Sequence, residues 1–97
     1  MKRIEAVNRL KRHVRALKAF GATSLYLFGS TARNEARRKS DLDLFVDYDP
    51  KRFTLMELVG IKLFLEDELG IEVDVTTRDS LHPMLKRDIE QSAVRIF

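Results

Sequence analysis

Apolar residues recur along this chain with two different spacings, which predict an alternation of helices and strands. In residues 2–19 they recur every three or four positions, as on one face of an amphipathic helix; they are Ile4, Val7, Leu10, Val14 and Leu17. A short basic helical segment is expected from Thr31 to about Arg38. A longer helix is predicted from Thr54, which forms a capping-box pattern with Glu57, to Gly70. Pro83 suits the first turn of a last helix that runs to about Ser92.

Strands are predicted where short apolar runs alternate with polar residues. They are Leu25 to Phe28, Asp41 to Asp47, Ile71 to Thr77 and a possible edge strand with Val94 and Ile96. The expected architecture is α/β, a small mixed β-sheet with helices mainly on one face, in a single domain over residues 1–97. The helix of residues 54–69 has more apolar residues than one face requires. The excess is either core on a second side or an exposed patch for a partner.

Composition narrows the class of protein further. Residues 1–40 hold 11 Lys and Arg against two acids, whereas residues 41–97 hold seven against 13. Such a charge-separated chain can attract a polyanion at one end and cations at the other. The chain has no cysteine, no signal-peptide pattern and no apolar run that would cross a bilayer, which favours a cytoplasmic location without membrane association. Nucleic-acid binding is not favoured, because the basic first helix lacks interleaved aromatic residues.

Candidate chemistry lies between Leu25 and Val46. Asp41 and Asp43 are two residues apart on a predicted strand, so their side chains point to the same face and can converge on a pair of divalent ions. Gly29 and Ser30 form a turn that opens a helix, and such N-termini attract phosphate. Arg33 lies one turn further on. It is placed either to contact a triphosphate or to form a salt bridge with an acid such as Glu35 or Asp41.

Asp74 is a third acid, in the middle of an otherwise β-branched strand. If this strand pairs beside residues 41–47, Asp74 joins Asp41 and Asp43 in one cleft; the alternative is a structural salt bridge, for example with Arg78. Asp47 and Asp49 are expected in the turn that Pro50 makes.

These residues together resemble the minimal nucleotidyltransferases of the DNA polymerase β superfamily, of the kind that accompany HEPN-domain toxins. The matching residues are Gly29, Ser30, Arg33, Ser40, Asp41, Asp43 and Asp74. The resemblance covers nearly the whole chain and implies the polymerase β-like nucleotidyltransferase fold. One departure is Asn34, where relatives commonly have glycine. Asparagine tolerates positive φ better than most residues, so the turn is expected to persist.

The resemblance implies a nucleotidyltransferase. Two Mg²⁺ ions would be held by Asp41, Asp43 and Asp74, and ATP would be contacted by Gly29, Ser30, Arg33 and Ser40. It further implies transfer of AMP to a hydroxyl, a tyrosine, of a HEPN-type toxin that forms a hetero-oligomer with this chain, which then acts as an antitoxin. The alternative is a non-catalytic antitoxin that neutralises the toxin by direct complex formation, through the surplus apolar face of residues 54–69 and the basic first helix.

Overall fold

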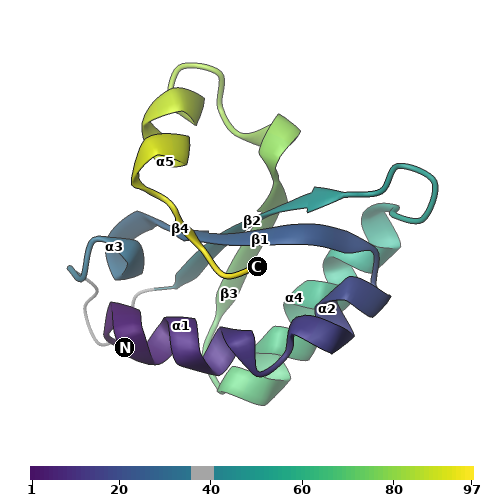
Figure 1. Ribbon diagram of the computed structural model, residues 1–97, viewed down its shortest axis with the longest axis horizontal. Coiled ribbons are helices and arrows are strands. Elements are labelled where there is room, and N and C mark those ends of the chain that lie inside the picture. Colours follow the sequence, from purple (N-terminus) through teal and green to yellow (C-terminus); the bar gives the residue numbers. More distant parts are fainter. Residues whose placement is uncertain (36–40) are drawn as a thin grey trace.

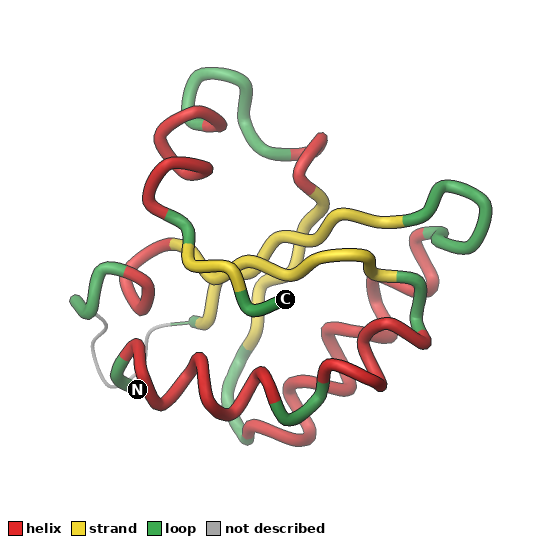
Figure 2. The backbone as a smooth tube through the Cα atoms, viewed as in Figure 1, coloured by secondary structure: helices red, strands yellow, loops and turns green. Residues whose placement is uncertain are grey.

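A four-stranded mixed sheet forms the centre of this chain, whose computed structural model describes residues 1–35 and 41–97 (Figures 1 and 2). The strand order is β3-β2-β1-β4, with β2 and β3 parallel and the other pairs antiparallel. The strands are β1 (Ala22–Phe28), β2 (Leu42–Tyr48), β3 (Val73–Thr77) and β4 (Val94–Arg95). The helices are α1 (Arg3–Lys11), α2 (Val14–Ala19), α3 (Gly29–Ala32), α4 (Leu55–Leu69), η1 (Arg78–Ser80) and α5 (Lys86–Ser92).

One face of the sheet carries the main hydrophobic core. Helices α1, α2 and α4 cover this face, while η1 and α5 lie on the opposite side (Figure 1). Alternation along β2 directs Leu42, Leu44 and Val46 into the core, where they pack with Leu10 of α1 and Leu65 of α4. The predicted mixed sheet with helices mainly on one face is therefore confirmed, and the polar face of β2 is left for other uses.

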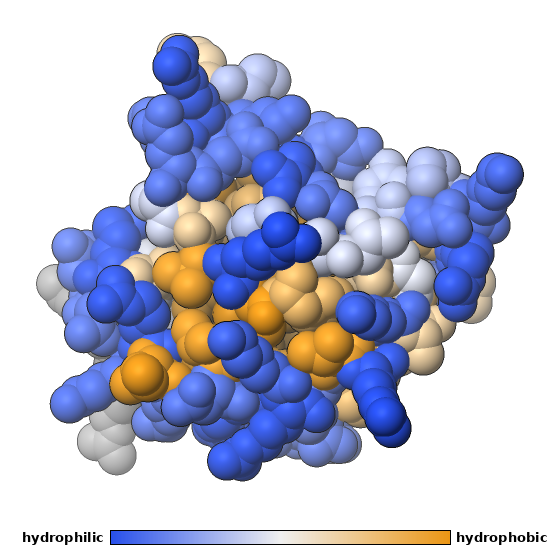
Figure 3. Space-filling view, in the orientation of Figure 1, coloured by the Kyte–Doolittle hydropathy of each residue, from blue (hydrophilic) through white to orange (hydrophobic). Residues whose placement is uncertain are grey.

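The first predicted helix is in fact two helices, so the expectation of one helix over residues 2–19 was wrong. The chain breaks at Arg12 and His13, and His13 packs edge-on against Phe64 of α4 with ring centroids 5.3 Å apart. Ile4 was assigned to the apolar face but is 70% exposed. It borders a hollow lined also by Val7 and Val94, and apolar side chains gather between α1 and the C-terminal strand in the space-filling view (Figure 3).

Helix α4 begins and ends where the sequence predicts. The Thr54 hydroxyl accepts the N–H of Met56 at 3.2 Å, and the Glu57 carboxylate accepts the N–H of Thr54, which completes the capping box. Gly70 ends the helix in the left-handed conformation, at φ 70°. Across residues 1–35 and 41–97, no helix has the length and apolar character needed to span a bilayer.

The C-terminal segment differs in one respect from the prediction. Pro83 lies in a turn, and α5 begins three residues later at Lys86, so Pro83 is not in the first turn of the helix. The His82 carbonyl accepts the N–H groups of Leu85 and Lys86, and this tight turn precedes the helix. β4 then pairs with β1 as the predicted edge strand, and the Phe97 carbonyl accepts the N–H of Leu25 at 3.1 Å.

Candidate active site

The parallel pairing of β2 and β3 brings two of the predicted acids together. Asp43 is the register partner of Asp74, so their side chains leave neighbouring strands on the same face of the sheet. Asp41 lies directly before β2 and is exposed, whereas Asp43 is partly buried. The expectation that β3 pairs beside β2 and carries Asp74 to the Asp43 face is confirmed. The alternative salt bridge from Asp74 to Arg78 does not form, because Arg78 has other partners.

Gly29 packs directly against Asp43. It follows Phe28, the last residue of β1, which is the register partner of Asp43. Gly29 has φ 75°, and a Cβ added there would overlap the Asp43 carboxylate and lie 3.1 Å from its Cγ. Only glycine fits this conformation and this contact without strain. The next residue, Ser30, belongs to α3, so the Gly-Ser pair lies beside the acids as the start of a helix. The helix predicted from Thr31 to about Arg38 was wrong in its bounds, because α3 begins at Gly29 and ends at Ala32; residues 36–38 lie outside the described residues.

The environment of Asp43 disfavours its charged form. Burial raises the pKa of the Asp43 carboxyl, the negative charges of Asp74 and Asp41 raise it further, and the nearby Arg33 guanidinium partly opposes them. Asp43 thus carries a charge that costs free energy until a cation approaches. Asp74 is the register partner of Asp43 and Asp41 lies two residues before it, so both acids are near enough to act on Asp43.

These acids fit a magnesium site in their chemistry, since Mg²⁺ prefers carboxylate oxygens. A cation would offset the cost of burial and the repulsion that raise the pKa of Asp43. Among residues 1–35 and 41–97, however, no three His, Cys, Asp or Glu side chains are placed closely enough to hold one ion together. An ion bound by all three acids at once would therefore require them to converge further, whereas one or two carboxylates with phosphate oxygens suffice for Mg²⁺.

Arg33 lies at the rim of the site. Its Nε donates to the Glu35 carboxylate at 3.1 Å, and both side chains are exposed, so this pair is one that a phosphate can displace. Asn34 has φ 60°, so asparagine adopts the left-handed conformation here. The expectation that the turn persists with asparagine in place of glycine is confirmed. The Asn34 side-chain oxygen accepts the backbone N–H of Arg3 and so fastens the turn to α1. Ser40, the remaining predicted ligand, lies outside the described residues.

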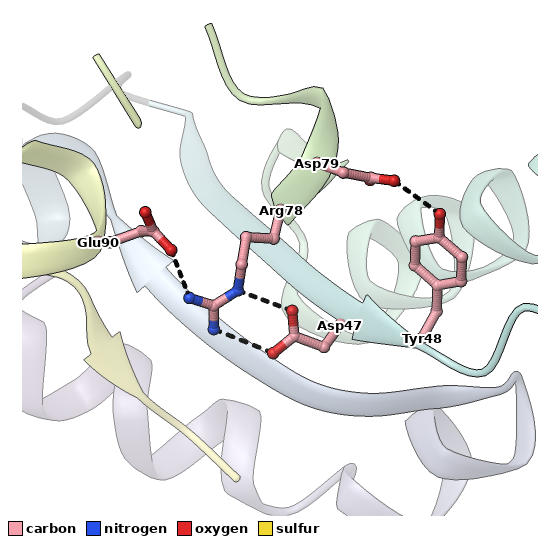
Figure 4. Close-up of polar contacts among 5 residues, drawn as sticks. All are labelled: Asp47, Tyr48, Arg78, Asp79 and Glu90. Atoms are coloured by element: carbon pink, nitrogen blue, oxygen red, sulfur yellow. Dashed lines mark hydrogen bonds and ion pairs between the residues drawn. The ribbon is translucent and has the colours of Figure 1, made fainter. Parts of the chain in front are cut away.

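An arginine network that the sequence did not predict covers the rest of the acid face (Figure 4). The Arg78 guanidinium donates to both carboxylate oxygens of Asp47, at 2.7 and 3.0 Å, and to Glu90 at 2.6 Å. It also lies over the rings of Tyr26 and Phe45, 4.8 and 5.0 Å from their centroids. Phe45, fully buried, separates Asp43 from this network along β2.

The network corrects the placement of Asp47. Asp47 belongs to β2 and binds Arg78, so its assignment to the turn was wrong, whereas Asp49 does accept the N–H of Lys51 in that turn. At the next position, the Tyr48 hydroxyl donates to Asp79 at 2.8 Å (Figure 4), and this carboxylate raises the pKa of Tyr48. These contacts tie η1 and α5 to the end of β2, beyond the acids.

Comparison with known proteins places the chain among nucleotide-transferring enzymes. A family model described as "Nucleotidyltransferase domain" matches residues 7–96. The chain is 41% identical over 92 residues to a Methanocaldococcus jannaschii protein named "Putative protein adenylyltransferase MJ0435", covering 94% of this chain and 98% of that protein. A solved "putative minimal nucleotidyltransferase" matches with a TM-score of 0.83 and 35% identity over 97% of this chain and 95% of its own.

A more distant structure shares the fold. It is a crystal structure of a toxin–antitoxin with AMP-PNP, which matches with a TM-score of 0.71 at 19% identity, over 90% of this chain and 72% of its own. In all of these comparisons, the aligned part includes most of the chain, so the acids of β2 and β3 lie inside the shared domain.

Proposed function

The chain belongs to the nucleotidyltransferase domain family, and on that basis we propose that it is a protein adenylyltransferase that transfers AMP from Mg-ATP to a tyrosine hydroxyl of a cognate HEPN-type toxin. By this modification it acts as an antitoxin. The observation that carries the proposal is the pairing of Asp43 with Asp74 across β2 and β3, with Gly29 packed against Asp43. Two acids on neighbouring strands beside a Gly-Ser turn suit metal-assisted chemistry on a phosphate.

Each residue of the site has a distinct role in this proposal. Asp41, Asp43 and Asp74 would hold two Mg²⁺ ions, which would supply positive charge against the triphosphate and favour deprotonation of the attacking hydroxyl. The acceptor oxygen forms a bond to the α-phosphorus, the bond to the β-phosphate oxygen breaks, and pyrophosphate leaves. Asp74 helps to take the proton from the hydroxyl.

The phosphates are held from the other side of the site. Ser30 and the Gly29 backbone bind the β- and γ-phosphates, and Ser40 adds a contact from the segment before Asp41. Arg33 offsets negative charge on the departing pyrophosphate. Its exposed pairing with Glu35 supports this role, because little free energy is lost when the guanidinium turns to a phosphate.

The comparisons support a protein as the acceptor. Nucleotidyl transfer requires oriented carboxylates and cations more than covalent participation by the protein, so a chain of 97 residues suffices for catalysis. A toxin–antitoxin crystallised with AMP-PNP shares this fold, which supports a partner protein that supplies the hydroxyl.

Labelling experiments test the proposal directly. The chain is incubated with its neighbour-encoded toxin, Mg²⁺ and ATP labelled at the α-phosphate, and label on the toxin is mapped by peptide mass spectrometry. The double variant Asp41→Asn/Asp43→Asn is expected to lose the label. The matched control, Glu68→Gln/Asp88→Asn, removes two exposed acids that are not part of the candidate site. It is expected to transfer label to the toxin as wild type does.

The same variants separate catalysis from simple occlusion of the toxin. If Asp41→Asn/Asp43→Asn suppresses the toxin as well as wild type does, and neither transfers label, the chain neutralises by complex formation and the enzymatic proposal fails. Label on a serine or threonine in place of a tyrosine would correct the acceptor alone.

A further inference from the structure

Helix α4 has an exposed apolar face that the fold does not use. Leu55, Met56, Val59 and Leu63, here called the α4 stripe, are 73, 83, 45 and 58% exposed. Their spacing places them along one face of the helix. The core is formed by other positions, which are Ile61, Leu65 and Leu69. The surplus apolar residues of this helix were expected either to form core on a second side or to form an exposed patch. These four residues form an exposed patch.

A continuous stripe of this kind indicates an interaction surface. Single exposed apolar residues are ordinary on protein surfaces, but four neighbours on one helix face form a patch that is costly to leave in water. Beside the N-terminal end of the stripe, Leu55 and Leu58 border a cavity of about 240 Å³ with Tyr48 and Phe53. This cavity can receive an apolar side chain from a partner.

Charges of opposite sign flank the two ends of the stripe. Lys51 and Arg52, both exposed, lie in the turn that leads into α4, and the exposed Asp67 lies in its last turn with Glu66 beside it. Glu66 is already bound to Lys62 and to the Val73 N–H. Asp67 has no ion-pair or hydrogen-bond partner among the described residues. The stripe is thus basic at one end and acidic at the other.

The α4 stripe is complementary to a second copy of itself that lies antiparallel to it. Leu55 and Leu63 each lie four residues from Val59 along α4, with the basic turn before Leu55 and the acidic last turn after Leu63. An antiparallel copy of the stripe, centred on Val59, sets leucine against leucine and each basic end against an acidic end. A parallel copy would set like charges together at both ends. The dipoles of the two helices also favour the antiparallel pairing.

We propose that the α4 stripe is a dimer interface, where two copies of this chain pack their α4 helices antiparallel about a two-fold axis near Val59. A two-fold contact of this kind is closed, since each copy offers the same patch and none remains free. Leu55 contacts the second copy's Leu63, and Met56 extends the apolar contact. Asp43 alternates along β2 with the leucines that pack against α4, so the acid site lies on the opposite face of the sheet and stays open in the dimer.

Sedimentation velocity of the full-length chain tests the proposal without nucleotide or toxin. Wild type is expected to shift from monomer to dimer as its concentration rises to the millimolar range. Val59→Asp sets two carboxylates face to face at the axis and is expected to remain monomeric. Met56→Asp, at a more exposed position that the fold tolerates, is expected to do the same. Met84→Asp, at an apolar residue 84% exposed away from α4, is the matched control and is expected to dimerise as wild type.

Charge reversal tests the orientation of the helices. Lys51→Glu/Arg52→Glu makes both ends acidic, and Asp67→Lys places a base at each end, so each variant is expected to lose the dimer. The two variants mixed together, or the three changes combined in one chain, are expected to restore it. A mixture of wild type and the triple variant should form no mixed dimer if the helices are antiparallel, whereas parallel helices would form one.

Three results would overturn the proposal. Wild type could remain monomeric at every concentration, or Val59→Asp could dimerise as wild type while folded by circular dichroism. Finally, wild type could be a monomer that binds the toxin, while Val59→Asp no longer binds it. That result would assign the α4 stripe to the toxin. None of these three results depends on whether the monomer transfers AMP. The dimer proposal and the adenylyltransferase proposal therefore fail independently.

Discussion

Replacing Gly29 with alanine tests whether the contact between Gly29 and Asp43 positions the site. At φ 75°, alanine costs about 1–2 kcal/mol in backbone strain. The new methyl group would in addition overlap the Asp43 carboxylate, so the carboxylate must move away. Gly70 offers a matched control, because it has φ 70° but nothing within 4 Å of an added Cβ.

The two alanine variants should therefore share a loss of stability and differ in activity. Each is expected to lower the melting temperature by about 4–8 °C for every kcal/mol of strain. Gly70→Ala should keep a rate close to wild type. Gly29→Ala displaces the Asp43 carboxylate, and a misplacement of about 1 Å at a reacting centre costs on the order of a hundredfold in rate.

The assay is the initial rate of label transfer to the toxin, with the melting temperature measured on the same samples. Rates are compared below the melting temperature of both variants, so that unfolding does not contribute. If Gly29→Ala transfers label as fast as Gly70→Ala, the position of the Asp43 carboxylate is not what requires glycine, and the reasoning from the overlap is refuted.

Three further predictions concern stability. Arg78→Met should lower the free energy of unfolding by about 2 kcal/mol, the scale of a hydrogen bond to a charged group, while the exposed control Arg87→Met changes it little in urea titrations. The pKa of Glu66 is lowered by the Val73 N–H and then by Lys62, so its stabilisation is present above the ordinary glutamate pKa and is lost as pH falls through the lowered value. Glu66→Gln should therefore melt lower than wild type at neutral pH, a difference that Glu68→Gln does not show and that disappears in acid. Mg²⁺ should raise the melting temperature of wild type above that in EDTA, and Asp43→Asn should reduce this rise; an equal rise in both would exclude Asp43 as a ligand.

Local signals in the sequence were sufficient where the structure depends on neighbours along the chain. The Thr54 capping box and the Gly70 helix end are set by a few adjacent backbone groups, and both were predicted correctly. The alternation of β2 correctly separated Asp43 from the core leucines. The position of Asp74 on the face of Asp43 also followed, because a one-residue slip of β3 against β2 would turn the apolar face of β3 away from the core.

Contacts between distant segments were not predictable in the same way. The apolar spacing continues through Arg12 and His13, so nothing local marks the break that sets His13 against Phe64. The sequence offers several acids as candidate partners of Arg78. The selection of Asp47 and Glu90 depends on how β3 lies beside β2 and how α5 returns over the sheet. A contact partner that is set by tertiary geometry gives no periodic signal in the sequence.

The burial that stabilises the sheet also gives the candidate site its electrostatic character. Phe45 is fully buried on the acid face, beneath Arg78 and between Tyr26 and Phe28. Asp43, two residues away on the same strand, shares part of this burial, and burial is the largest cause of its raised pKa. Arg78 neutralises Asp47 at the far end of the face, but among the described residues only the exposed Arg33 offsets the charges near Asp43. The fold thus leaves one end of the acid face compensated and the other end short of positive charge, and a divalent cation delivered with a nucleotide would supply it.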